Sequence, residues 1–303
     1  MHDVHARVEL LPVSLLGQHR QLVQEMQEIG ETLGLGLGWH YLLDLPWAAH
    51  QLHALPGTLF LDAGAGRGAM QWWLAEQGVD VISVDRVDRS ILPRQFLRAY
   101  RVRGLRDKDL ARSTTAITFR AFLPPGSPRF WATYPSKVRA TLNALLARDD
   151  RRGEGTVYIY NQDLRRMADV ASESIDAVVS ISALEHNHLD DLRACVPELM
   201  RVLKPGGKLV ATLAGAKDED WYHEPSKGWC YTEATLREIF QLPDDCPSNY
   251  DRYDELFTAL CQCTELRDNL ADFYFRSGDN GMPWGVWDPK YQPVGVVKVK
   301  PLA

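Results

Sequence analysis

The sequence lacks the patterns that mark several classes of protein. It has five cysteines, with no Cys-x-x-Cys pair and no cysteine–histidine zinc spacing, so we expect no metal site. Its first residues show no basic stretch followed by an apolar one, and no run of 18 apolar residues occurs, so we expect neither a signal peptide nor a membrane span. The odd cysteine count without an export signal is typical of a reducing cytoplasm, where we expect the protein to be located.

The composition is that of a globular protein with an uneven charge. The chain has 303 residues, of which 45% are hydrophobic and 24% charged, and its net charge is −6. Residues 86–152 contain sixteen Lys and Arg against five Asp and Glu, so this segment carries +11 and the rest of the chain −17. One strongly basic segment therefore lies within an acidic protein.

Helices and strands alternate along most of the chain. The apolar spacing predicts a helix over 15–33 and a second helix after Pro46. Strands are predicted at 58–61, 79–84, 156–160, 176–181, 208–213 and 294–299, with a weaker one at 273–275. Strands separated by helices indicate an α/β fold with a mostly parallel sheet. We expect a helical extension over 1–57 and one domain over 58–303, with a large helical insertion or lid over 86–155, after the second of these strands.

Two local features lie in the second half of the chain. Pro197 interrupts the apolar face of the helix before Arg201, so we expect a kink or a restart there. Thr232 precedes an apolar pattern and is expected to cap a helix.

A glycine-rich loop follows the first of these strands. Gly64, Gly66 and Gly68 allow a tight turn and a close approach of a ligand to the backbone. Asp85 ends the next strand, 19 residues after Gly66, where a carboxylate can accept hydrogen bonds from ribose hydroxyls. The pair predicts a cofactor that contains a nucleoside, although Gly64-x-Gly66-x-x-Ala69 also satisfies the dinucleotide fingerprint.

Further motifs distinguish between these cofactors. Asp62 stands two positions before the first glycine, and the third strand ends in Asn161-Gln162-Asp163-Leu164. The fourth strand leads into Ser182-Ala183-Leu184-Glu185-His186, and Val202-Leu203-Lys204-Pro205-Gly206-Gly207 precedes the fifth. With these motifs, residues 58–213 without the insertion resemble the class I S-adenosylmethionine-dependent methyltransferases, in their small-molecule branch. The resemblance implies a Rossmann-like, seven-stranded, mostly parallel sheet with helices on both faces and an antiparallel last strand.

The resemblance also assigns cofactor-binding residues. S-adenosyl-L-methionine is the implied cofactor, and S-adenosyl-L-homocysteine the product. Gly64, Gly66 and Gly68 are expected along its methionine part and ribose, Asp85 on the ribose hydroxyls, Asp163 and Leu164 at the adenine, and Asp62 and Ser182 near the methionyl ammonium. We add Arg86, which directly follows Asp85, to this set.

The expected reaction is methyl transfer to a small-molecule or glycan-type acceptor, with oxygen favoured because no Asn-Pro-Pro-Tyr-like amine site follows the fourth strand. An oxygen acceptor needs a general base, for which His186, Glu185 and His223 are the candidates. His186 suits positioning of the acceptor as well as proton abstraction. The alternatives are a non-catalytic protein that binds S-adenosylmethionine as a scaffold, and a nicotinamide-dependent oxidoreductase.

The basic segment has three interpretations. Its cations pair with the acidic remainder of the chain, or they bind an anionic partner such as a phosphorylated acceptor or the surface of a membrane, on which a basic helix starting at Pro93 would lie. The third interpretation is nucleic acid, which we do not expect because no recognised binding motif is present.

Overall fold

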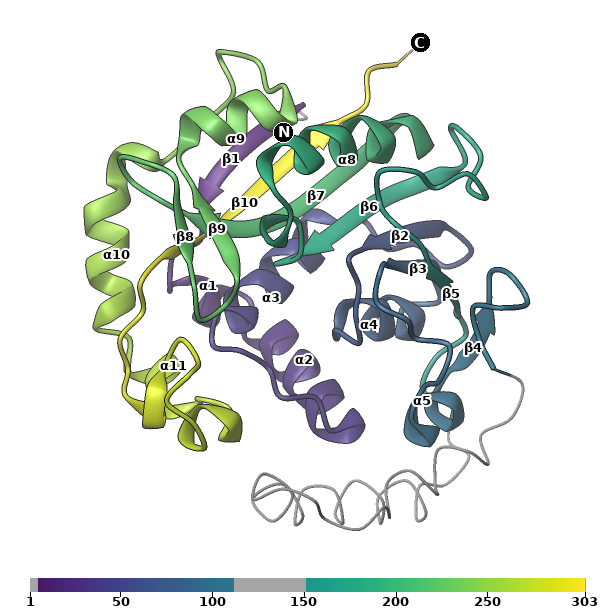
Figure 1. Cartoon of the computed structure of the whole chain (residues 1–303), viewed down its shortest axis with the longest axis horizontal. Coiled ribbons are helices and arrows are strands. Elements are labelled where there is room, and N and C mark those ends of the chain that lie inside the picture. The colour runs from purple at the N-terminus through teal and green to yellow at the C-terminus, as the bar shows by residue number, and fades with distance from the viewer. Residues whose placement is uncertain (1–4, 112–150, 303) are drawn as a thin grey trace.

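The computed structural model describes residues 5–111 and 151–302 and shows helices around a central sheet (Figure 1). The strands in these residues are β1 (Ala6–Leu10), β2 (Leu59–Ala63), β3 (Asp80–Asp85), β4 (Arg101–Gly104), β5 (Thr156–Asn161), β6 (Ile175–Ile181), β7 (Leu203–Gly215), β8 (Trp221–His223), β9 (Gly228–Tyr231) and β10 (Gln292–Val299). The helices are α1 (Leu15–Gln18), α2 (Arg20–Leu33), α3 (Tyr41–Gln51), α4 (Met70–Glu76), α5 (Arg94–Ala99), α8 (Leu189–Val202), α9 (Glu233–Phe240), α10 (Tyr253–Cys261) and α11 (Thr264–Asp268).

The sheet has a parallel centre and an antiparallel edge. Its strand order is β1-β10-β7-β6-β2-β3-β5-β4, and the β8–β9 hairpin pairs with the end of β7. Strands β4, β5, β3, β2, β6 and β7 are parallel, whereas β10 is antiparallel to both β7 and β1. The expected Rossmann-like α/β fold with an antiparallel last strand is confirmed. The expected number of strands is wrong, because the described residues form ten strands and not seven.

Two of the additional strands, β1 and β4, come from segments expected to be helical. In β1 alternate residues are buried: Ala6, Val8 and Leu10. The partner strand β10 lies at the opposite end of the chain, so no local sequence pattern predicts the pairing. Strand β4 lies within the expected insertion and pairs with β5. The weak strand expected at 273–275 is instead a short 3-10 helix, Asp272–Phe275.

Two apolar cores cover the two faces of the sheet. One contains Val81, Val179 and Val210 from the strands and packs under α2, α3, α4 and α5. The other contains the neighbouring residues Ile82 and Val178 and packs under α8 and α9. Neighbouring strand residues point to opposite faces, which is why each strand supplies both cores.

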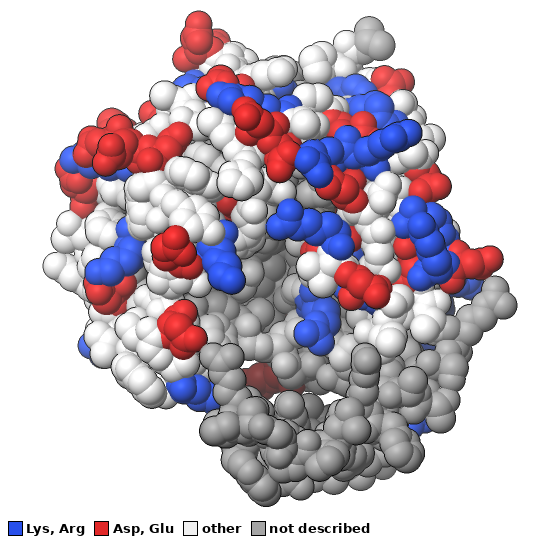
Figure 2. Space-filling model, in the orientation of Figure 1, with Lys and Arg blue, Asp and Glu red and all other residues white. Residues whose placement is uncertain are grey.

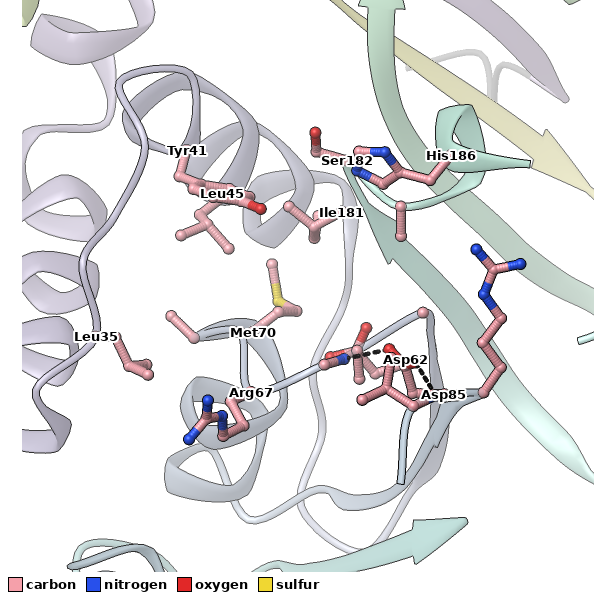
Figure 3. Close-up of a pocket in the computed structure, with 18 of the residues that line it drawn as sticks. Leu35, Tyr41, Leu45, Asp62, Arg67, Met70, Asp85, Ile181, Ser182 and His186 are labelled. Carbon is pink, nitrogen blue, oxygen red and sulfur yellow. Dashed lines mark hydrogen bonds between the residues drawn. The ribbon is translucent and has the colours of Figure 1, made fainter. Parts of the chain in front are cut away.

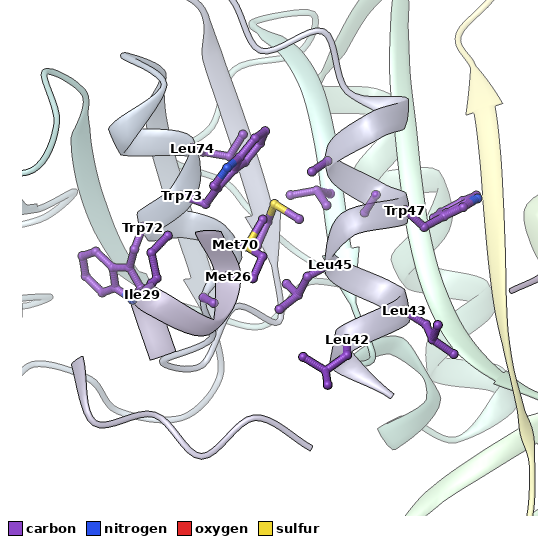
Figure 4. Close-up of a cluster of buried hydrophobic side chains, with 14 of the residues drawn as sticks. Met26, Ile29, Leu42, Leu43, Leu45, Trp47, Met70, Trp72, Trp73 and Leu74 are labelled. Carbon is purple, nitrogen blue, oxygen red and sulfur yellow. The ribbon is translucent and has the colours of Figure 1, made fainter. Parts of the chain in front are cut away.

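The N-terminal segment packs into the first of these cores. Figure 4 shows Met26 of α2, Trp47 of α3 and Trp72 of α4 in a single cluster, and Trp72 and Trp47 are fully buried. Helix α3 begins five residues before Pro46, so the expectation that it follows Pro46 is wrong. Its docking needs Gly295 on β10, because a Cβ atom there would lie 2.3 Å from the Trp47 ring.

The expected insertion is only partly described. Residues 86–111 contain α5 and β4, and the remaining described residues, 151–155, lead into β5. Residues 112–150, with six of the sixteen basic residues, lie outside the described residues, so the lid interpretation stays a prediction. Several described cations pair with acids: Arg106 donates to both oxygens of Asp109, and Arg152 contacts Glu76 and Glu28. Figure 2 likewise shows Lys and Arg interspersed with Asp and Glu on the visible face.

The remaining local expectations have mixed outcomes. Helix α8 is a single helix over Leu189–Val202, so Pro197 does not restart it. Thr232 caps α9 as expected, its hydroxyl accepting from the Thr235 amide. No helix among the described residues is long and apolar enough to span a membrane.

Candidate functional site

A cavity of about 480 Å³ lies at the carboxyl ends of β2, β3 and β6. Its volume is within the usual range for small-molecule and cofactor sites. The glycine loop forms one side, α3 with the segment before it forms the opposite side, and the residues after β6 form the third (Figure 3). All nine residues assigned to cofactor binding from the sequence line it: Asp62, Gly64, Gly66, Gly68, Asp85, Arg86, Asp163, Leu164 and Ser182. That common location agrees with the assignment; their individual roles remain proposals.

The glycine loop is fixed by sterics and by hydrogen bonds. Gly64 has a φ of +74°, and a Cβ atom on it would lie 2.5 Å from the Ala183 Cβ. Gly66 has a φ of +49°, and its amide donates to Asp85 Oδ2 at 2.8 Å. The loop therefore needs glycine both for its backbone conformation and for its approach to the end of β6.

A buried polar network supports the loop from beneath, and no sequence pattern indicates it. Gln71 donates to the carbonyls of Ala65 and Gly68 and accepts from the Ser83 hydroxyl. Arg89 donates to the Gly66 carbonyl at 2.9 Å and to Ser83 Oγ at 2.5 Å. Arg89 belongs to the basic segment, but only its burial in the fold distinguishes it from the exposed cations around it.

Two carboxylates of the cavity differ in their surroundings. Asp62 is 2% exposed, and burial raises its pKa to about 7, although Arg89 opposes the shift. Asp85 lies at the cavity with partial exposure, and its oxygens accept from the amides of Gly66 and Val87. Each Asp85 oxygen keeps a second acceptor direction, which suits a pair of ribose hydroxyls.

Two residues lie at the expected adenine end of the cavity, one charged and one apolar. Asp163 forms an ion pair with Arg165 at 2.6 Å, and that side chain lowers the Asp163 pKa. Leu164 beside it is 9% exposed and offers an apolar surface to a flat ring. Because Asp163 is ionised and retains acceptor directions, it can still accept from an exocyclic amine.

The residues after β6 combine strain, burial and a free imidazole nitrogen. Ser182 has a φ of +45°, and its hydroxyl donates to Glu185 Oε1 at 2.5 Å. Glu185 is 4% exposed, burial raises its pKa, and it does not line the cavity, so it reaches the cavity only through Ser182. His186 lines the cavity, and its Nδ1 lies 3.0 Å from the Lys227 carbonyl oxygen. A carbonyl only accepts, so Nδ1 carries a proton. Within the described part of the chain no residue hydrogen-bonds to Nε2, which in a neutral ring can accept a proton.

The third candidate base lies elsewhere. His223 is 7% exposed and is not among the described residues that line the cavity. Its ring packs against Trp221 and Tyr291, and its Nδ1 is 2.8 Å from Ser226 Oγ. Burial lowers its pKa. The structure therefore does not bring His223 together with His186 at this cavity, and its position in the chain, at the end of β8, could not have shown this.

The wall opposite the glycine loop comes from the N-terminal segment. Leu35, Leu37 and Leu45 line it together with Tyr41, whose ring points into the cavity in Figure 3. Burial and the nearby Glu185, Asp44 and Asp62 carboxyls raise the Tyr41 pKa, so its hydroxyl remains protonated at neutral pH. This wall is largely apolar.

The residues present fit the expected cofactor. Asp62 and Ser182 offer acceptors to an ammonium group, Asp85 offers acceptors to ribose, and Leu164 offers an apolar surface to adenine. The bare backbone of Gly64 and Gly66 leaves room that a side chain would fill. The described residues contain no group of three or more His, Cys, Asp or Glu arranged to hold a metal ion.

Three solved structures illustrate the similarity of folds. The [4+2]-cyclase SpnF is 14% identical, with 98% of this chain and 99% of that chain covered and a TM-score of 0.48. The 1,6-didemethyltoxoflavin-N1-methyltransferase of Burkholderia thailandensis is 14% identical, covers 95% and 85%, and has a TM-score of 0.41. A phosphoethanolamine N-methyltransferase of Haemonchus contortus is 15% identical, covers 95% and 59%, and has a TM-score of 0.47.

Two further comparisons were made, with curated proteins and with models of protein families. A search of curated proteins gave no match. The family model described as a methyltransferase domain matches residues 138–211, a range that includes β5, β6, α8 and the first part of β7. The glycine loop lies outside this range, yet β2 pairs with β6 and brings the loop to the same cavity. The matched methyltransferase domain covers part of the chain, and the strand order and the cavity residues agree with the resemblance to the class I S-adenosylmethionine-dependent methyltransferases.

Proposed function

We propose that the protein is an S-adenosylmethionine-dependent methyltransferase that transfers the methyl group to an oxygen atom of a small molecule with an apolar body. The single observation that carries the proposal is the position of His186, which lines the cavity with Nδ1 committed to the Lys227 carbonyl and Nε2 free. A neutral imidazole in this state is suited to remove a proton from a hydroxyl at neutral pH.

The cofactor, when bound, supplies an activated methyl group on a sulfonium. The residues of the chain then bind, align and deprotonate. Gly64 and Gly66 let the backbone approach the cofactor, and Asp85 is placed to accept from its ribose. Alignment of acceptor and methyl group alone can lower the barrier by roughly 7–11 kcal/mol. Proton removal by a positioned base adds a rate factor of roughly 10²–10⁴.

The lining of the cavity favours an apolar acceptor over a glycan. Leu35, Leu37 and Leu45 face the glycine loop across the cavity, and Met70 and Ile181 add further apolar surface. A glycan would need hydrogen-bond partners for many hydroxyls, and this wall offers chiefly that of Tyr41. Among the described residues that line the cavity, two are basic, Arg67 and Arg86, and both are exposed. A phosphate on the acceptor would meet these two cations.

The test uses tritium-labelled S-adenosylmethionine and a panel of a phenol, a catechol, an aliphatic alcohol, an aniline and a primary amine. We expect label on a hydroxyl compound. Label confined to the amines would contradict the choice of oxygen, and failure to bind S-adenosylhomocysteine would contradict the cofactor.

The role of His186 is tested with His186→Gln and with His188→Gln as its matched control. His188 is an exposed histidine two positions away that does not line the cavity. We expect His186→Gln to lower kcat by about 10²-fold or more without changing the affinity for S-adenosylhomocysteine, and His188→Gln to change neither. Equal turnover of the two variants would remove His186 as the base.

A further inference from the structure

Arg89 is a buried arginine beneath the cofactor loop. It is 4% exposed and follows β3 in the basic segment. Its guanidinium donates to the Gly66 carbonyl, to both the hydroxyl and the carbonyl of Ser83, and weakly to the Tyr160 carbonyl. Its own backbone amide donates to Asn161 Oδ1, which fixes the loop after β3 against the end of β5.

The surroundings of this cation are unusual for a buried charge. Its hydrogen-bond acceptors are neutral, its Nε has no partner, and it forms no ion pair with a carboxylate among the described residues. Burial accordingly lowers its pKa, while the charges of Asp85, Asp62 and Asp109 act in the opposite direction. Removing a charge from water is costly unless other charges or hydrogen bonds compensate. The cation is therefore placed to act on Asp62 and Asp85 at a distance.

Both of these carboxylates line the cavity. The Gly66 amide donates a hydrogen bond to Asp85, and the Gly66 carbonyl accepts one from Arg89. Gly66 is thus fixed on both sides in its left-handed conformation, so that the loop is preformed for its ligand.

We propose that Arg89 is a positioning residue for the cofactor: it fixes the Gly66 backbone and supplies the positive charge that keeps Asp62 ionised when the methionyl ammonium binds. The inference rests on the proposed cofactor site. The groups that act on Asp62 are Arg89 and Asp85 from the β3 side, the Gln71 amide from α4, and Tyr41 from α3. Without the cation, the buried Asp62 carboxylate faces the negative charge of Asp85, which favours its protonated form.

Charge and geometry can be separated with two substitutions. Arg89→Met removes both the charge and the hydrogen bonds, whereas Arg89→Lys keeps the charge and loses the planar fork. Arg103→Met is the control, because Arg103 is an exposed cation on β4, in the same basic segment and outside the cavity lining. Asp62→Asn removes the titrating group itself.

The experiment is isothermal titration calorimetry with S-adenosylhomocysteine from pH 6 to pH 9. For the wild type we expect affinity to rise with pH around a midpoint near pH 7 and to level off above about pH 8. Arg89→Met moves this midpoint upward by at least about one pH unit, so that its affinity at pH 7 falls by about fivefold or more and recovers at higher pH. Arg89→Lys keeps the midpoint but binds more weakly at every pH, and Arg103→Met follows the wild type.

An unchanged midpoint in Arg89→Met, with or without a uniform loss of affinity, overturns the inference and leaves the proposed function intact. Wild-type protein that does not bind S-adenosylhomocysteine overturns the proposed function instead. If Arg89→Met does not fold, Arg89→Lys and Asp62→Asn decide: the inference requires the first to keep the wild-type midpoint and the second to abolish it.

Discussion

Asp62 is expected to destabilise the free protein at the pH at which it helps to bind the cofactor. Its pKa is raised by burial from 3.8 to about 7, so between these values the folded protein holds a proton that the unfolded chain has released. Folding stability therefore falls as pH rises through this window. A shift of about three units corresponds to about 4 kcal/mol, reached in full only above pH 7.

The substitution Asp62→Asn removes this titration. The measured quantity is the difference in free energy of unfolding between Asp62→Asn and wild type, both without ligand, from urea denaturation. We expect this difference to be up to about 4 kcal/mol more favourable to the variant at pH 8 than at pH 4. Any fixed cost of the amide group is the same at both pH values and cancels in this comparison. A variant whose stability relative to wild type is the same at pH 4 and pH 8 would refute the reasoning.

Two further substitutions test the loop and the fold. Gly64→Ala places a Cβ 2.5 Å from the Ala183 Cβ, whereas Gly57, the control position, has a similar φ and open space around it. In thermal denaturation we expect Gly64→Ala to lose about 1–3 kcal/mol more folding stability than Gly57→Ala. Gly64→Ala should also bind S-adenosylhomocysteine more weakly. Equal losses would contradict the steric argument. Thr232→Ala removes the cap on the Thr235 amide and should cost about 1 kcal/mol in urea denaturation without affecting binding; an unchanged stability would count against the cap.

The sequence predicted those parts of the site that depend on neighbouring residues. Asp62, Gly64 and Gly66 are close together in the chain, and Asp85 follows at the end of the next strand, so a strand–loop–helix–strand pattern is sufficient to place them. The structure brings them to one cavity with Ser182.

The missed features depend on contacts between distant segments. Arg89 is one of many basic residues in its segment, and only the fold shows that it is buried beneath Gly66. Strand β1 pairs with β10 across the whole length of the chain, and α3 continues through Pro46 because its Trp47 docks against Gly295. Sequence patterns report local preference, and tertiary contacts decided each of these features.

The choice of base shows the same limit. His186 and His223 were both candidates because each follows a strand near the carboxyl edge of the sheet. The fold places one at the cavity and packs the other against Trp221 and Tyr291. The hydrogen bond to Lys227 that fixes the His186 tautomer joins residues 41 positions apart and leaves no trace in the sequence.

The most direct test of the central claim is calorimetric titration of the wild-type protein with S-adenosylhomocysteine and, separately, with NADH at pH 8. The account predicts saturable binding of one S-adenosylhomocysteine per chain, weakened by Gly64→Ala, and no binding of NADH. Binding of NADH without binding of S-adenosylhomocysteine would contradict it.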